Sequence, residues 1–177
     1  MNRKGRILIL TGDGKGKTTS ALGMAVRCAG WNKRVCILQF FKSSEYECGE
    51  RLLFNKIGIE ILPLGIGFSW QKTEKEQREA LINALNISLK KLEENYDMII
   101  LDEILNVFSQ KNIIVNDIVD EELIMNKIKE QSENKDIILT GRGCKEGFYN
   151  IADTVTEMKN IKHAYDRGIE ACKCIEY

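Results

Sequence analysis

A glycine-rich stretch near the N-terminus constrains the fold more than any other part of the sequence. The residues TGDGKGKTT, at positions 11–19, follow the apolar run ILIL and precede SALGMAVRCAG, in which apolar residues recur at helical spacing. A strand that turns through glycines into a helix is typical of a phosphate-binding loop, where backbone N–H groups and the helix N-terminus face an anion. The stretch therefore predicts a strand, a phosphate-binding loop and a helix.

The loop supplies the residue types that this chemistry needs. Its glycines stand at alternate positions, Gly12, Gly14 and Gly16. Lys17 is expected to place a positive charge against phosphate, and the Thr18 hydroxyl is expected to bind Mg²⁺. Two features depart from the usual pattern: Thr11 stands five residues before Gly16, where a glycine is usual, and a second lysine, Lys15, lies inside the loop.

The rest of the chain alternates short apolar runs with amphipathic segments. Strands are expected at 6–11, 34–41, 59–62, 98–101, 136–140 and 154–157, and helices at 17–29, 50–56, 73–95 and 120–133. Gly30 is expected to end the first helix in a left-handed conformation, and Thr73 with Glu76 forms a capping box. This alternation predicts an α/β fold, a mostly parallel sheet with helices on both faces.

Ligands of such sheets bind beyond the carboxyl ends of the strands. The loops expected to gather there are 11–19, 41–49, 63–72, 102–112 and 140–147. One proline, Pro63, and the lack of a Ser/Gly-rich linker leave no sign of a domain boundary, so residues 1–177 are expected to form one domain.

Two of these loops carry charged residues at strand ends. Asp102 and Glu103 follow the apolar run MIIL, where a carboxylate can reach a metal ion beside the loop threonine. Arg142 lies in TGRG after another apolar run. Its planar guanidinium could bind phosphate, but a surface arginine in a simple turn explains the pattern equally well.

Aromatic residues and cysteines suggest less specific roles. Phe68 and Trp70 in LGIGFSW either pack beneath the loop or form an apolar surface for a large planar ligand. The six cysteines form no CxxC pair and are expected to be reduced and mostly buried. His163, the one histidine, is expected to be a surface or capping residue.

The overall composition excludes several classes of protein. Lysine plus arginine and aspartate plus glutamate are equal at 26 each, so the basic field of a nucleic-acid-coating protein is absent. The N-terminal apolar run, Ile7–Leu10, is too short for a signal peptide or a membrane span. A cytoplasmic protein without a nucleic-acid or membrane partner is therefore expected.

Taken together, six motifs resemble the P-loop-type ATP:corrinoid adenosyltransferases over nearly the whole chain. They are TGDGKGKTTSALG, VCILQFFK, LGIGFSW, LDEI, LTGRG and IADTVTEMKNIKHAYDRGIEACKCIEY. The resemblance implies a P-loop NTPase-like (RecA-like) fold and a homodimer. It also implies a reaction in which the Co(I) centre of a corrinoid attacks the 5′ carbon of ATP and inorganic triphosphate leaves.

The resemblance assigns roles to individual residues. The triphosphate would be wrapped by Gly14, Lys15, Gly16, Lys17, Thr18 and Thr19, with Lys42 and Arg142 as further phosphate ligands. Mg²⁺, or Mn²⁺ in its place, would be bound by Thr18 and by a carboxylate at the strand end. The resemblance favours Glu103 for this carboxylate, and Asp102 is the residue just before Glu103. Asp13 stands where many relatives have asparagine, near the nucleotide sugar.

On the corrinoid side, Phe68 and Trp70 match an aromatic loop that packs under the corrin ring and displaces the lower axial ligand of cobalt. A reduced flavin or flavoprotein would supply the electrons, because the sequence shows no redox cofactor motif. Cys174 occupies a position that is glycine in relatives. The alternatives left open are a small-molecule or nucleoside kinase and, with less support, a RecA-like ATPase.

Overall fold

The computed structural model describes residues 4–67, 72–110, 117 and 120–177 of the chain. Its centre is a six-stranded sheet in the order β3-β2-β4-β5-β1-β6, and every pair of neighbours is parallel. The strands are β1 Ile7–Thr11, β2 Val35–Gln39, β3 Glu60–Pro63, β4 Met98–Asp102, β5 Asp136–Thr140 and β6 Thr154–Glu157. The predicted parallel α/β fold is therefore confirmed.

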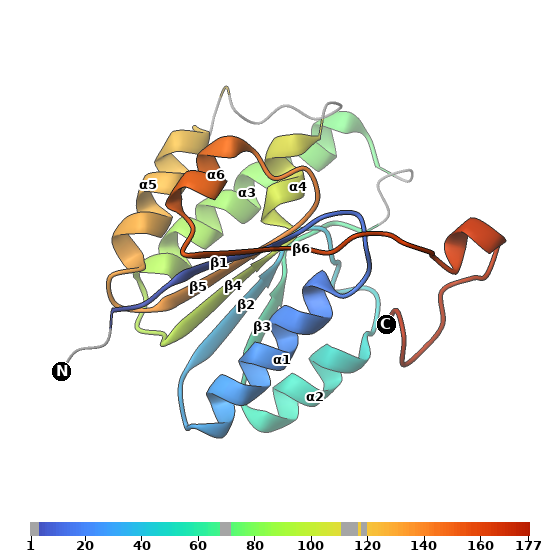
Figure 1. Cartoon of the computed structure of the whole chain (residues 1–177), viewed down its shortest axis with the longest axis horizontal. Helices are drawn as coiled ribbons and strands as arrows, with labels where there is room; N and C mark the ends of the chain where they lie inside the picture. The colour runs from blue at the N-terminus through green and yellow to red at the C-terminus, as the bar shows by residue number, and fades with distance from the viewer. Residues whose placement is uncertain (1–3, 68–71, 111–116, 118–119) are drawn as a thin grey trace.

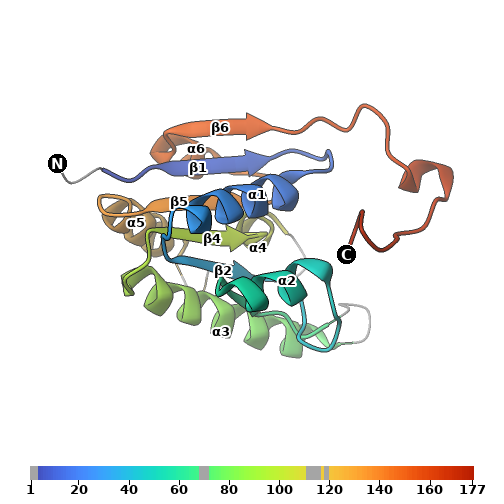
Figure 2. The ribbon, with the colours of Figure 1, turned by 90° about the horizontal axis from the view of Figure 1, so that it is seen from below.

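Helices cover both faces of this sheet (Figures 1 and 2). They are α1 Lys17–Gly30, α2 Gly49–Ile57, α3 Glu74–Glu93, α4 Ile104–Ser109, α5 Glu121–Gln131 and α6 Glu146–Ile151, followed by the 3₁₀ helix η2 Tyr165–Arg167. Helices α1 and α2 lie on one face, and α3 to α6 lie on the other. All residues of β2, β4 and β5 are buried, as expected for strands covered on both sides.

Each helical layer has its own apolar core. On the first face, Ala21 and Ala25 of α1 and Phe54 of α2 pack against the sheet. On the second face, Leu85 of α3 and Phe148 of α6 belong to a larger cluster. These two cores hold the carboxyl ends of the strands in fixed positions beneath the loops.

The capping box of α3 is present as predicted. Thr73 Oγ1 accepts a hydrogen bond from the Glu76 N–H at 3.3 Å, and Glu76 Oε2 accepts one from the Thr73 N–H at 2.8 Å. The end of α1 differs from the prediction, because Gly30 still belongs to the helix. The left-handed residue is Asn32, with φ of 55°, a conformation that asparagine adopts more readily than most residues.

Two short helices were not predicted. Helix α4 lies inside the expected loop 102–112, and four of its six residues are buried: Ile104, Leu105, Val107 and Phe108. A helix that is buried on most sides has no polar face, so the sequence shows no helical periodicity there. Helix α6 has only six residues, too few for a periodic pattern.

The cysteines are more exposed than the sequence suggested. All six are free thiols, but only Cys36 and Cys48 are buried, whereas Cys172 and Cys174 are exposed. Both exposed thiols belong to the segment that follows β6. This segment leaves the sheet, forms η2 and turns back, so that the C-terminus lies beside the loops at the carboxyl ends of the strands (Figures 1 and 2).

None of the helices in the described ranges has the length and apolar character needed to cross a membrane.

Candidate functional site

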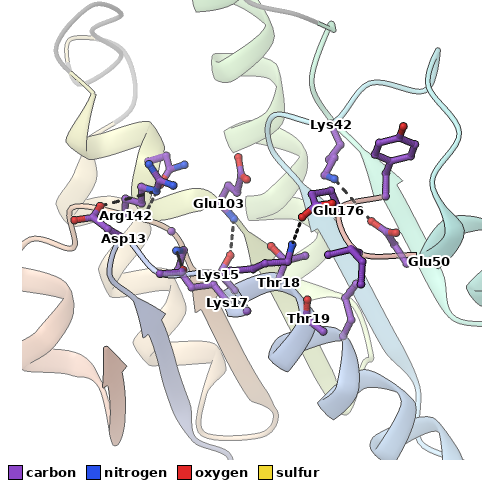
Figure 3. Close-up of a pocket in the computed structure, with 18 of the residues that line it drawn as sticks. Asp13, Lys15, Lys17, Thr18, Thr19, Lys42, Glu50, Glu103, Arg142 and Glu176 are labelled. Carbon is purple, nitrogen blue, oxygen red and sulfur yellow. Dashed lines mark hydrogen bonds and ion pairs between the residues drawn. The ribbon is translucent and has the colours of Figure 1, made fainter. Parts of the chain in front are cut away.

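A cavity of about 560 Å³ lies at the carboxyl ends of the strands (Figure 3). Four of the five loops that the sequence placed there contribute to its walls. The lining includes residues 13–19, Lys42, Gly49, Glu50, Glu103, Asn106, residues 140–142, His163 and residues 174–177. The fifth loop, 63–72, does not contribute any described residue to this lining.

The glycines of the phosphate-binding loop are needed because another segment passes very close to them. The Gly14 N–H donates a hydrogen bond of 2.7 Å to the carbonyl of Met158, just beyond β6. A Cβ atom at Gly14 would lie 2.6 Å from the Lys159 carbonyl oxygen, and one at Gly12 would lie 2.5 Å from the Met158 carbonyl oxygen. The loop shape is therefore set by the extension of β6 as well as by the loop itself.

Lys17 lies across this loop. Its Nζ donates hydrogen bonds to the carbonyls of Gly12 at 2.6 Å and Gly14 at 2.7 Å. Burial lowers the pKa of Lys17, and the nearby positive charge of Arg142 lowers it further. An amine held in this way is a point charge at the base of the cavity, which suits an anionic ligand.

The Asp102 carboxylate is the centre of a buried hydrogen-bond network. Its Oδ1 accepts from the Thr18 hydroxyl at 2.9 Å and the Thr140 hydroxyl at 2.7 Å. Its Oδ2 accepts from Gln39 Nε2 at 3.4 Å. The residue is only 1% exposed, and burial raises its pKa. Asp102 thus joins the phosphate-binding loop to the ends of β2, β4 and β5.

Glu103, unlike Asp102, lines the cavity. It has φ of 67°, in the left-handed region that costs energy for a residue other than glycine. Its N–H donates a hydrogen bond of 2.8 Å to Thr140 Oγ1, which fixes this turn. Burial raises the pKa of Glu103, and the negative charge of Asp102 adds to the effect.

Thr18 and Glu103 both line the cavity. Hydroxyl and carboxylate oxygens are hard ligands, and Mg²⁺ commonly takes one or two carboxylates and completes its shell with substrate phosphates and water. These residues therefore fit a Mg²⁺ ion bound together with a nucleotide. Among the described residues, no group of three or more His, Cys, Asp or Glu side chains could hold a metal by itself.

Each of the other cations around the cavity lies near a carboxylate of the same chain. Lys15 Nζ is 3.4 Å from Glu176 Oε1, Lys42 Nζ is 3.9 Å from Glu50 Oε1, and Arg142 Nε is 4.0 Å from Asp13 Oδ1 (Figure 3). These pairs are long and partly exposed, so each contributes little to stability, about 0–1 kcal/mol. Phosphate oxygens could replace the carboxylates at small cost.

Several residues of the site were not predicted. Asn106 Oδ1 accepts a hydrogen bond of 2.5 Å from the Arg142 N–H, so α4 holds the loop that carries Arg142. Glu50 and Glu176 face Lys42 and Lys15. Asn106 lies two residues after the motif LDEI, and Glu176 lies inside the C-terminal motif, but neither motif indicated that these side chains reach the phosphate-binding loop or the loop of Arg142.

The remaining predicted residues have different outcomes. Thr19 lines the cavity, as expected. His163 Nδ1 accepts a hydrogen bond of 3.2 Å from the Tyr165 N–H at the start of η2, and His163 also lines the cavity. Phe68 and Trp70 lie outside the described residues, so their part in the site stays a prediction.

Sequence and structure comparisons identify the relatives of this chain. Residues 3–177 match the family model of the ATP:corrinoid adenosyltransferases BtuR/CobO/CobP. The chain is 33% identical to the corrinoid adenosyltransferase of Escherichia coli K12 over 99% of its own length and 87% of that protein. It is 34% identical to the corrinoid adenosyltransferase CobA of Salmonella typhimurium, covering 98% of this chain and 86% of that one.

Among solved structures, the chain resembles the flagellar accessory protein FlaH of Methanocaldococcus jannaschii. The TM-score is 0.57 at 15% identity, over 89% of this chain and 72% of that chain. This likeness concerns the fold alone. On the family match and the two bacterial relatives, the chain belongs to the ATP:corrinoid adenosyltransferase family.

Proposed function

We propose that this chain transfers the 5′-deoxyadenosyl group of ATP to the cobalt of a reduced corrinoid and releases inorganic triphosphate. The observation that carries the proposal is the cation-lined cavity at the phosphate-binding loop of a chain that matches this family from residue 3 to residue 177. The match over this length also supports a single adenosyltransferase domain.

In the transfer, a Co–C bond forms with an electron pair from Co(I), and the bond between the 5′ carbon and the triphosphate oxygen breaks with its pair on oxygen. The leaving group is highly charged, so the protein must stabilise negative charge that grows on the oxygen. Lys17 and the loop that it spans lie where the triphosphate would bind, with Lys15, Lys42 and Arg142 around it. These residues bind and orient the leaving group.

Mg²⁺, for which Mn²⁺ could substitute, would bind Thr18 and Glu103 and would neutralise part of the triphosphate charge. Asp102 is buried, and its carboxylate oxygens accept hydrogen bonds from the side chains of Thr18 and Gln39. Its role in this proposal is to orient the Thr18 hydroxyl, and Glu103 supplies the carboxylate that faces the ligand. Asp13 at the cavity wall would accept hydrogen bonds from the ribose hydroxyls.

Other parts of the proposal come from the family resemblance. Phe68 and Trp70 would contact the corrin ring and displace the lower axial ligand of cobalt. A reduced flavin or flavoprotein would supply electrons, the protein would act as a homodimer, and the cytoplasm would be its compartment. Light scattering on the purified chain tests the dimer.

The reaction is tested with ATP, Mg²⁺ and chemically reduced cobalamin, followed by identification of the phosphate product. Triphosphate together with the spectrum of a light-sensitive alkylcobalt is the expected result. ADP with an unchanged corrinoid spectrum would instead indicate a kinase or an ATPase and overturn the proposal.

A matched pair of lysine variants tests the site. Lys17→Met should abolish binding of inorganic triphosphate, whereas Lys90→Met, at an exposed position on α3, should leave binding and turnover unchanged. Equal behaviour of the two variants would show that the triphosphate binds elsewhere.

A further inference from the structure

The C-terminal six residues form a compact turn that lies against the nucleotide cavity. We call Cys172–Tyr177 the C-terminal turn. The Cys174 N–H donates to the Tyr177 carbonyl at 2.9 Å, and the Glu176 N–H donates to the Cys172 carbonyl at 3.0 Å. Four of its residues, 174–177, line the cavity together with the phosphate-binding loop.

Cys174 adopts a backbone conformation in this turn that is unfavourable for a residue other than glycine. Its φ is 74°, in the left-handed region that favours glycine. A strained non-glycine residue persists only where its surroundings support it, which here are the bonds within the turn. The turn is therefore held together by hydrogen bonds among its own residues.

Glu176 is the polar link between this unit and the rest of the described chain. Its Oε1 is 3.4 Å from Lys15 Nζ, and its Oε2 accepts from the Cys172 N–H at 2.9 Å. Both contacts lower the pKa of Glu176, the Cys172 hydrogen bond first, so the carboxylate is charged at neutral pH. An anion of the chain thus lies in a cavity suited to an anionic ligand.

The ion pair of Lys15 with Glu176 differs from the other ion pairs of the cavity in the segment that carries the carboxylate. Asp13 lies on the phosphate-binding loop, which is bonded through Gly14 to Met158, and Glu50 lies on α2, which packs on the core through Phe54. Glu176 lies on a turn that follows a mostly exposed segment, residues 159–171. Exchange of the Glu176 carboxylate for a phosphate oxygen at Lys15 would therefore release the C-terminal turn.

We propose that Glu176 is an internal competitor for the triphosphate site and that the C-terminal turn leaves Lys15 when triphosphate binds. The turn returns as triphosphate departs, which assists release of this product. The inference rests on the proposed function, because it takes the triphosphate of ATP as the ligand of this cavity.

Calorimetric titration of the full chain with inorganic triphosphate and Mg²⁺ tests the competition. Glu176→Gln should bind triphosphate about two- to fivefold more tightly than the unmodified chain, the range that a partly exposed ion pair allows. Glu170→Gln removes an equal charge from the same exposed segment, at a position away from the cavity lining, and should leave the affinity unchanged. In a Lys15→Met background, Glu176→Gln should have no effect.

Movement of the turn needs a separate measurement. A nitroxide on Cys172, in a chain with Cys28, Cys144 and Cys174 replaced by serine, should show a narrower electron paramagnetic resonance spectrum when triphosphate saturates the site. Glu176→Gln should show the narrow spectrum without triphosphate. An unchanged spectrum together with tighter binding would mean that Glu176 acts only through its charge, and the proposed displacement would be wrong.

The two proposals fail in different ways. If the unmodified chain does not bind triphosphate, the assignment of the nucleotide site is wrong. If triphosphate binds but Glu176→Gln binds it equally or more weakly, the site stands and the competition does not.

Discussion

The Thr18 hydroxyl donates a hydrogen bond of 2.9 Å to the Asp102 carboxylate, which joins the start of α1 to the end of β4. Asp102 also accepts from Thr140, and the same Thr140 oxygen accepts from the Glu103 N–H. The proposed Mg²⁺ ligands, Thr18 and Glu103, are thus held in place by a buried carboxylate and a buried hydroxyl between them. Orientation of metal ligands by such neighbours commonly decides metal affinity.

Asp102→Asn is therefore expected to weaken Mg²⁺ binding in the presence of ATP by about 10- to 100-fold. The asparagine amide N–H group would face a side chain that donates a hydrogen bond to Asp102. This unpaired donor should lower the free energy of unfolding by about 1–3 kcal/mol. Metal titration of turnover and urea unfolding measure the two effects. Asp120→Asn at the N-cap of α5 is the matched control, because asparagine caps helices as well as aspartate. Full Mg²⁺ affinity in Asp102→Asn would contradict the positioning role.

Two glycine variants test the close approach of the β6 extension. Gly14→Ala would place a Cβ atom 2.6 Å from the Lys159 carbonyl oxygen, so we expect a loss of about 1–3 kcal/mol in unfolding free energy and weaker ATP binding. A Cβ atom at Gly23, inside α1, would meet nothing within 4 Å among the described residues, so Gly23→Ala should stabilise the protein by about 0.5–1 kcal/mol. Thermal unfolding and ATP titration of both variants give the comparison. Equal effects would show that the extension yields to the methyl group.

Much of the fold and part of the site could be predicted because their signals are local. The phosphate-binding loop lies between an apolar strand and an amphipathic helix, and the carboxylates of β4 follow a continuous apolar run. The parallel sheet then brings those two segments together without further information. For the same reason Lys17, Thr18 and Glu103 could be named before the structure.

What could not be predicted depends on contacts between distant segments. Helix α4 is apolar on most sides, so its sequence resembles a buried loop more than an amphipathic helix. The hydrogen bond from Gly14 to Met158 and the ion pair of Lys15 with Glu176 join the first strand–helix unit to the last segment of the chain. No periodic pattern in the sequence indicates that this last segment lies against the phosphate-binding loop.

Asn106 offers a prediction about a helix that the sequence did not reveal. Its Oδ1 accepts a hydrogen bond from the Arg142 N–H, and Ser109 Oγ donates one of 3.1 Å to the Arg142 carbonyl, so two residues of α4 hold the backbone of Arg142. Asn106→Ala should weaken triphosphate binding by about 2- to 10-fold, the range for loss of one hydrogen bond. Asn150→Ala, at an exposed position on α6, is the control. If Arg142→Ala loses affinity and Asn106→Ala does not, the arginine needs no support from Asn106.

The capping box of α3 predicts a dependence of stability on pH. The hydrogen bond from the Thr73 hydroxyl, with that from the Thr73 N–H, lowers the pKa of Glu76 from its ordinary value. A carboxyl with a lowered pKa in the folded state stabilises the protein above its unfolded pKa and loses that contribution as the pH falls through the folded value. Glu76→Ala should therefore unfold at lower urea concentration than the unmodified chain at neutral pH, and the difference should vanish once the pH is below the folded pKa. If the difference in stability persists at low pH, it arises from the helix propensities of glutamate and alanine and not from the capping box.

Trp70 tests the corrinoid side of the proposed function. If its ring displaces the lower axial ligand, Trp70→Ala should slow turnover from Co(II) with a reduced flavin by about tenfold or more, equivalent to about 1.4 kcal/mol or more in the barrier. Turnover from preformed Co(I) should be largely spared, because that cobalt no longer has to be reduced. Trp31→Ala removes an indole that is 78% exposed at the far end of α1 and should leave both rates unchanged. Equal losses in the two Trp70→Ala assays would mean that the indole binds the corrinoid without affecting its reduction.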